Sequence, residues 1–366
     1  AGGVTSIMDM PNTNPLTVTL DALNAKLDLL NEKCIVNHSC YFGATNNNYT
    51  EFDKLDKHRV CGIKLFMGSS TGNMLVDKMN SLLNIFNGTD MLIAAHCEDQ
   101  ETIKNNIEKY KQKYKGADDI PVSAHPSIRS VPACYASSEL AVRLAKIAGA
   151  RLHILHVSTA KELQLFSDEP LASKNITAEA CVAHLLFTLT HYNSLGTRIK
   201  CNPAVKRKTD REALRAAVNS GLIDVIATDH APHLLNEKEG GALKAMSGMP
   251  MIQFSLVSML ELVDEGVFSL ETVVQKMCHA PARIYGICHR GYIREGYQAD
   301  LVLVRPNSPW EVSADKILSK CGWSPMEGQR FHAQVEKTFV NGSLVYDNGQ
   351  LHKEVRGQAL TFRRAL

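Results

Sequence analysis

Long apolar runs are missing from this sequence: no stretch among its 366 residues approaches the roughly 18–20 residues of a membrane span. No secretory signal, internal repeat or low-complexity segment is visible either. Neither sign of charge is in excess, because the sequence has 40 Lys and Arg residues and 38 Asp and Glu residues. The net charge of +2 is too small to favour nucleic acid or an anionic membrane as a partner.

Paired cysteines are also missing. The ten cysteines include no C-x-x-C motif, which argues against a structural zinc ribbon. A disulfide framework is not expected in a chain of this size, in which 45% of the residues are hydrophobic. We interpret the cysteines as reduced, mostly buried thiols of a cytoplasmic protein.

Short β-branched runs alternate with amphipathic stretches along most of the chain. This alternation favours a parallel sheet, and the number of units predicts an α/β (β/α)8 TIM-type barrel. Helices are predicted at residues 19–32, 133–148 and 210–220, of which the last two are the clearest. Strands are predicted at residues 4–10, 35–42, 62–67, 91–96, 151–156, 176–181 and 224–229. That is one strand fewer than a closed barrel needs, so we expect the first βα unit to precede residue 1.

The pattern changes after residue 290. Further strands are expected at 299–304, 335–340 and 343–346, and the Asn341-Gly342 pair between the last two is a hairpin signal. We therefore predict a barrel domain over residues 1–290 and a small β-rich domain over residues 291–366.

Metal-ligand residue types follow the predicted barrel strands. His96, His156 and Asp229 close three of them, and Lys64 lies on a fourth. Functional residues of such barrels lie at the carboxyl ends of the strands. A single strand-end His is more often a hydrogen-bonded structural residue, an Asp there is often a helix cap, and a Lys alone is typical of a surface. The three strand ends together indicate a metal site with histidine and carboxylate ligands.

Several motifs in order resemble the dihydroorotases of the amidohydrolase superfamily, over nearly the whole chain. The most specific are MPNTNP at residues 10–15 and TDHAPH at residues 228–233. The others are GIKLF at 62–66, AHCE at 95–98, LHVST at 155–159 and ADLV at 299–302. This resemblance implies reversible, metal-dependent hydrolysis of the cyclic amide of dihydroorotate to N-carbamoyl-aspartate, a step of pyrimidine biosynthesis.

The resemblance also implies a metal centre. Lys64, carboxylated by CO2, would bridge two divalent metal ions, with zinc as the expected metal. His96 and His156 would hold the second ion. Asp229 would bind metal and act as the catalytic acid–base group. The ions would lower the pKa of a bound water and stabilise the oxyanion.

Substrate binding is implied at three further positions. Asn12 and His233 would bind the substrate carboxylate, and Asn202 is a candidate for the ring amide, with a turn residue before proline as the equally weighted alternative. His230 is expected to be structural. The family's His-x-His motif, with two further ligands and an arginine shortly after it, occurs nowhere in the 366 residues.

Three alternatives stay open at this point. Allantoinase and dihydropyrimidinase would share the barrel and the metal site, although Asn12 favours dihydroorotase because it can donate to a carboxylate. A non-catalytic partner of aspartate transcarbamoylase is the third, although such relatives usually lose metal ligands. A homodimer is left open.

Overall fold

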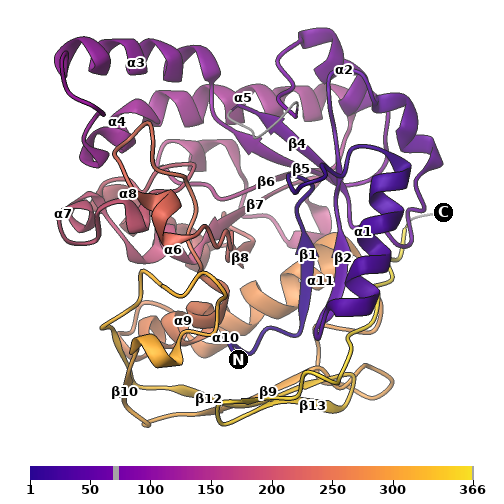
Figure 1. Cartoon of the computed structure of the whole chain (residues 1–366). Helices are drawn as coiled ribbons and strands as arrows, with labels where there is room; N and C mark the ends of the chain where they lie inside the picture. Colours follow the sequence, from indigo (N-terminus) through magenta and orange to yellow (C-terminus); the bar gives the residue numbers. More distant parts are fainter. Residues whose placement is uncertain (69–73, 365–366) are drawn as a thin grey trace.

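The computed structural model describes residues 1–68 and 74–364. Parallel strands follow one another around a barrel in chain order, as Figure 1 shows. Strand β1 pairs with β2, and a six-stranded sheet continues in the order β3-β4-β5-β6-β7-β8. The bounds are Ser6–Asp9 (β1), Asn37–Cys40 (β2), Phe42–Gly43 (β3), Ile63–Met67 (β4), Ile93–Cys97 (β5), Leu152–Ile154 (β6), Ile176–Cys181 (β7) and Val225–Ala227 (β8).

The predicted strand at 35–42 is interrupted at Tyr41, with β2 before it and β3 after it. Both pieces occupy one barrel position, because β2 pairs with β1 and β3 pairs with β4. Seven barrel positions are therefore filled, as the sequence predicted. Within residues 1–68 and 74–364, no strand pairing joins β1 to β8.

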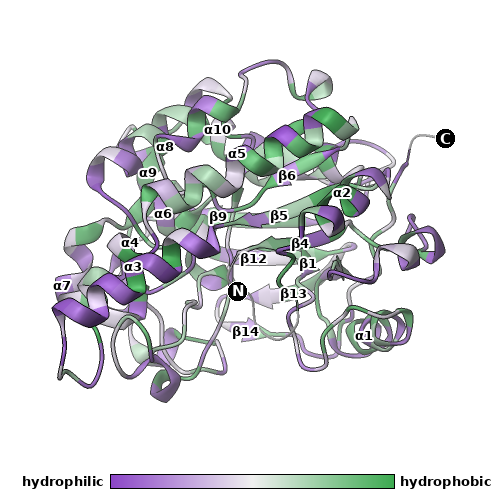
Figure 2. Ribbon diagram, turned by 90° about the horizontal axis from the view of Figure 1, so that it is seen from above, coloured by the Kyte–Doolittle hydropathy of each residue, from purple (hydrophilic) through white to green (hydrophobic). Residues whose placement is uncertain are grey.

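Strands β4 and β5 are buried along their whole length, as expected of parallel strands covered on both faces. Helices cover the outside, and Figure 2 shows α5 beside β5 and β6. Thr19 caps α1 through its side chain, and Gly149 ends α5 in the left-handed conformation, so local signals set these boundaries. The main helices are α1 (Leu20–Lys33), α2 (Met79–Asn87), α3 (Gln100–Lys113), α5 (Val131–Ala148), α8 (Lys208–Ser220), α9 (Ser255–Asp264) and α11 (Ala280–Tyr285).

In the part of the chain that the structure describes, none of these helices combines the length and the apolar character that crossing a bilayer requires.

A second, antiparallel sheet lies beneath the barrel in Figure 1, with the order β14-β13-β12-β9. Asn341 and Gly342 both have positive φ, at 52° and 81°, and connect β12 to β13. The hairpin predicted from this pair is confirmed, because such turns need positive φ at both central residues. The strands are Leu301–Arg305 (β9), Gln334–Val340 (β12), Ser343–Asp347 (β13) and Gln350–Leu351 (β14), beside a short pair of Trp310–Glu311 (β10) and Arg330–Phe331 (β11).

A buried polar network joins the second sheet to the barrel. The Asp300 carboxylate accepts hydrogen bonds from the Asn37 side chain at 3.0 and 3.1 Å and from the Asn341 backbone at 2.8 Å. It also pairs with Arg290, and both side chains of this ion pair are more than 90% buried. The tail then returns to the barrel, where the Gly357 N–H donates to the Cys34 carbonyl. The division between residues 290 and 291 stays a prediction.

Asp300→Ala should lower the free energy of unfolding by about 3–5 kcal/mol, because it leaves the buried Arg290 charge without its partner. Asp347→Ala is the matched control, since the Asp347 pair with Lys337 is about one-third exposed and screened by solvent, so its loss should change the free energy of unfolding little. Denaturant unfolding of both variants measures the difference. Equal, small losses would show that the network does not hold the two sheets together.

Candidate active site

The four predicted metal-site residues come together inside the barrel. Lys64 lies on β4 and His96 on β5, while His156 and Asp229 each follow the end of a strand by two residues. Lys64, His96 and His156 are 2%, 4% and 5% exposed. Asp229 lies beside them in the barrel mouth. Solvent reaches its side chain, although protein atoms surround it and the charge of Lys64 lowers the pKa of its carboxyl group.

The two histidines face each other. Nδ1 of His96 lies 3.1 Å from Nε2 of His156. The other ring nitrogen of His96, Nε2, donates to Glu98 at 3.0 Å, which places the ring proton on Nε2 and leaves a lone pair on Nδ1. Burial lowers the pKa of both histidines, so both rings are neutral near pH 7 and able to bind a metal ion.

Lys64 is a buried amine without a hydrogen-bond partner among the described residues. Burial lowers its pKa to about 7, against smaller opposing effects of Cys97, Asp229 and Glu179. Its Nζ atom lies 4.0 Å from the centre of the Phe66 ring. A substantial fraction of this amine is therefore uncharged at neutral pH, which is the form that reacts with CO2.

Asp229 and His156 both have strained backbones, with φ of 44° and 39°. Residues other than glycine rarely adopt this region, and such strain gathers at functional sites. Burial by surrounding protein atoms and then the charge of Glu179 raise the pKa of the Asp229 carboxyl, while Lys64 lowers it. The backbone at both residues thus aims a side chain into the barrel mouth at a conformational cost.

Asp229 does not share one ligand position with the histidines. Among the described residues, Glu261, Asp264 and His332 form the one group whose ligand atoms all lie within 4.8 Å of one another, and it lies at the surface. The ligand atoms of Asp229, His96 and His156 therefore do not all lie within 4.8 Å of one another, although the two imidazoles are in direct contact. Exposed acidic groups like the surface cluster are common without any ion, so that cluster carries no functional weight.

The three predicted substrate-binding residues are not tied to the metal-site residues in the way that these are tied to one another. Asn12 is exposed in the loop after β1, and His233 is half-buried after β8, with Nδ1 3.6 Å from Oε2 of Glu237. Asn202 has a buried Oδ1 with no partner within the described residues, which suits an N–H donor of a ligand. No hydrogen bond or ion pair joins any of these three to the four metal-site residues in the described part of the chain, so their roles stay predictions.

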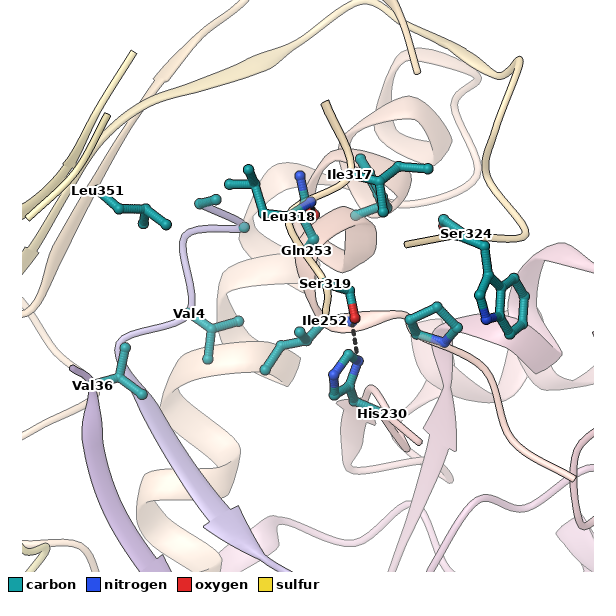
Figure 3. A pocket seen from close by; sticks show the side chains of 15 residues that line it. Val4, Val36, His230, Ile252, Gln253, Ile317, Leu318, Ser319, Ser324 and Leu351 are labelled. Atoms are coloured by element: carbon teal, nitrogen blue, oxygen red, sulfur yellow. Dashed lines mark hydrogen bonds between the residues drawn. The ribbon is translucent and has the colours of Figure 1, made fainter. Parts of the chain in front are cut away.

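An apolar pocket of about 250 Å³ lies between the segment before β1 and the segment after β8. Figure 3 shows Val4 and Val36 on one side of it, with His230 below and Ser324 on the other side. The His230 ring accepts hydrogen bonds from two backbone N–H groups, Met251 at 3.1 Å and Ile252 at 3.2 Å. His230 thus holds the chain after β8, which agrees with the structural role expected for it.

A model of the amidohydrolase family matches residues 1–345, well over half of the sequence. This chain belongs to the amidohydrolase family. The amidohydrolase is 32% identical to a dihydroorotase of Halobacterium salinarum, over 95% of this chain and 79% of the relative. It is also 29% identical to an allantoinase of Bacillus velezensis, over 95% of this chain and 77% of the relative.

Among solved structures, the amidohydrolase resembles the L-hydantoinase (dihydropyrimidinase) of Arthrobacter aurescens, with a TM-score of 0.92 and 28% identity. The match covers 98% of this chain and 81% of the hydantoinase. Together these relatives confirm the predicted TIM-type barrel with its C-terminal β domain. They also identify the chain as a cyclic amidohydrolase, without fixing its substrate.

The amidohydrolase family is generally metal-dependent, and the residues present fit a metal ion. The paired imidazoles are neutral, buried and oriented with their nitrogens toward each other, and the Lys64 amine has no partner of its own among the described residues. Such a set, with imidazole and oxygen ligands, is the donor chemistry of a catalytic zinc site.

Sequence reasoning missed a carboxylate–arginine pair behind His96. Glu98 is fully buried, accepts a hydrogen bond from Nε2–H of His96 and pairs with Arg129. Although burial opposes the charge, Arg129 and His96 hold the pKa of Glu98 to about 2. Glu98 stands in the AHCE motif and was visible there, whereas nothing in the sequence around Arg129 indicated its role. The pair fixes the orientation and tautomer of His96.

Glu98→Gln should weaken metal binding by about 10–100-fold, because the neutral amide holds the His96 proton less firmly than the carboxylate. Glu101→Gln is the matched control, since Glu101 is exposed in the first turn of the neighbouring helix α3. Competition with a fluorescent chelator measures the affinity of each. If both variants bind metal equally well, Glu98 does not position His96.

Glu179 was also missed, although a carboxylate inside the buried strand β7 is a visible signal. Its Oε2 lies 3.1 Å from Nε2 of His153, and its Oε1 accepts a hydrogen bond from the His156 backbone at 3.3 Å. Glu179 therefore supports the strained backbone at His156 from inside the barrel.

Proposed function

We propose that this amidohydrolase is a dihydroorotase that hydrolyses the cyclic amide of dihydroorotate reversibly to N-carbamoyl-aspartate. The observation that carries the proposal is the cluster of Lys64, His96, His156 and Asp229 in one barrel mouth. The two imidazoles are in contact, the pKa of the Lys64 amine is lowered and the pKa of the Asp229 carboxyl is raised, which supports metal-dependent hydrolysis. The Asn12 side chain in the MPNTNP motif and the dihydroorotase relatives support the choice of substrate.

In the proposed centre, His96 and His156 would hold one divalent ion, for which zinc is the expected metal. The Lys64 amine would add to CO2 with loss of one proton, and the two oxygens of the resulting carbamate, which share one negative charge, would serve as metal ligands. Asp229 would supply a further carboxylate ligand. When bound, the ions lower the pKa of water and stabilise negative charge on the amide oxygen.

The chain's own residues then move the proton. Asp229 accepts the proton that the attacking water loses, holds it, and delivers it to the ring nitrogen as the amide bond breaks. Its raised pKa suits this role, because a carboxylate that is harder to ionise is a stronger base. Glu98 and Arg129 keep the His96 ring oriented throughout.

Substrate selection is proposed to depend on donors around the barrel mouth. Asn12 donates to the carboxylate of dihydroorotate, together with His233. Asn202 accepts a hydrogen bond from a ring N–H through its Oδ1, which has no partner among the described residues. Dihydrouracil and hydantoin have no carboxylate at this position. The proposed substrate is therefore a small organic anion, which the donors at this position distinguish from the two uncharged compounds. A cytoplasmic location stays a prediction.

Asn12→Asp tests this assignment, because it replaces a donor by a negative charge. KM for dihydroorotate should rise by about tenfold or more, while turnover of uncharged dihydrouracil, where measurable, should not change. Asn105→Asp on helix α3 is exposed and serves as the matched control. Steady-state assays with dihydroorotate, allantoin, hydantoin and dihydrouracil measure both the preferred substrate and the effect of the variants.

Two outcomes would replace dihydroorotate as the substrate. The similarity to a hydantoinase with a TM-score of 0.92 makes a preference for hydantoin or dihydrouracil the second candidate, and the allantoinase relative makes allantoin another. A preference for any of these, with Asn12→Asp unchanged, would contradict the dihydroorotase assignment. Metal binding without turnover of any cyclic amide would favour the non-catalytic alternative.

A further inference from the structure

A strongly basic pocket of about 850 Å³ opens at the amino-terminal ends of the barrel strands. Leu92, Arg151 and Asn175, which line it, directly precede strands β5, β6 and β7. Helix α11 and the residues after it form another wall. Catalytic groups of such barrels lie at the opposite, carboxyl-terminal face, so this pocket is separate from the site described above.

The lining is cationic without any acidic residue. It includes six arginines or lysines and no aspartate or glutamate: Arg151, Lys174, Arg283, Arg290, Arg363 and Arg364. Two of these charges are neutralised by carboxylates just outside the lining, Lys174 by Asp224 at 2.8 Å and Arg290 by Asp300. Four guanidinium groups are left without an ion-pair partner among residues 1–68 and 74–364.

Two of the four guanidiniums are fixed by the backbone. Arg364 donates to the carbonyls of Lys57, Tyr285, Val60 and Cys61, and Arg151 donates to the carbonyl of Ile284 at 2.6 Å. The two are close enough that Arg151 adds to the effect of burial in lowering the pKa of Arg364. Asp90 is the carboxylate whose charge acts on both, and it is already paired with Lys57 at 2.5 Å.

The other two guanidiniums are free to move toward a ligand. Arg283 and Arg363 are both exposed, and neither side chain makes a hydrogen bond or ion pair within the described residues. Holding like charges around one concavity is unfavourable unless an anion offsets them. Planar guanidiniums match the oxygens of a phosphate group in pairs, and they do so better than ammonium groups.

We propose that this basic pocket binds a phosphorylated small molecule through a diphosphate group, with Arg283 and Arg363 as its mobile contacts and Arg151 and Arg364 as its fixed floor. The volume lies within the 300–1,000 Å³ of small-molecule sites, so it accommodates more than a single ion. The ligand is distinct from the substrate of the barrel mouth, and the proposal does not depend on which cyclic amide is hydrolysed.

Calorimetric titration of the full-length protein with inorganic pyrophosphate and with ADP tests the proposal. Treating the protein with a chelator beforehand removes metal, so that neither ligand binds at the catalytic centre. Saturable binding is expected, and it should weaken as the salt concentration rises. Equal affinities would identify the diphosphate as the whole recognition element, and tighter binding of ADP would show that the nucleoside contributes.

The double variant Arg283→Gln/Arg363→Gln should weaken both ligands by at least about tenfold, the worth of one charge-assisted hydrogen bond. Because neither side chain holds any described part of the fold, and two like charges are removed from the pocket, the melting temperature should not fall. Arg143→Gln/Lys146→Gln removes the same charge from exposed positions on α5 and should leave binding intact. No saturable binding, or equal binding by parent and the Arg283/Arg363 variant, would overturn the proposal.

Discussion

Lys64→Ala should lose cyclic-amide hydrolysis by on the order of 10³-fold or more, because it removes the ligand proposed to bridge the two ion positions. The buried amine has no partner among the described residues and a pKa of about 7, so a structural role does not account for its placement. Metal content should fall in parallel. A short carboxylic acid such as acetate or propionate should restore part of the activity, since it can replace the carbamate oxygens.

Lys78→Ala is the control for this experiment, because Lys78 is exposed at the start of α2. Activity, metal content and rescue are measured together on the full-length protein. Carboxylation predicts that bicarbonate raises the activity of the parent protein after CO2 has been removed. A Lys64→Ala variant that keeps both its metal and its activity would show that the carbamate is not part of the centre.

Asp229→Asn should lower kcat by about 10²–10⁴-fold, the usual contribution of general acid–base catalysis. The amide keeps the size of the carboxyl group but cannot accept the proton that the water loses. KM should change much less, because substrate binding is assigned to Asn12, Asn202 and His233. The acid side of the pH–rate profile should also flatten, since the parent needs Asp229 ionised and its activity rises as pH rises through that ionisation.

Metal content measured on the same Asp229→Asn sample separates proton transfer from coordination. Asp264→Asn, exposed at the end of α9, is the matched control and should keep the parent's rate. A variant with full metal and near-parental kcat would mean that another group moves the proton. Loss of one ion together with the rate would instead assign Asp229 mainly to coordination.

The barrel could be predicted from the sequence because its signals are local. Each buried strand is a short, mostly apolar run, and β4 and β5, which are buried along their whole length, lie within two residues of the predicted bounds. Where tertiary pairing sets the strand, prediction was less exact: the break at Tyr41 arises because β2 and β3 pair with different neighbours. The strand predicted to end at Asp229 ends at Ala227, where the chain turns into the strained segment.

In the candidate site, too, residues with a local sequence signal could be predicted, and residues placed by tertiary packing could not. The place of His96 and His156 in the barrel mouth could be predicted, because His96 lies near the carboxyl end of β5 and His156 follows β6 by two residues. Arg129 could not, since it meets Glu98 across 31 positions of sequence and only the packing of α4 (His125–Ile128) brings it there. The basic pocket was also invisible, because it gathers residues from Leu92 to Arg364 that share no motif.

Anomalous diffraction at the zinc absorption edge, from crystals of the full-length protein grown with zinc, tests the metal centre most directly. The account predicts a peak within about 2.0–2.3 Å of Nδ1 of His96 and Nε2 of His156. A second peak is expected beside Asp229, with the density of Lys64 extended by a carboxyl group between the two. Peaks absent from the barrel mouth, or confined to Glu261, Asp264 and His332 at the surface, would contradict it.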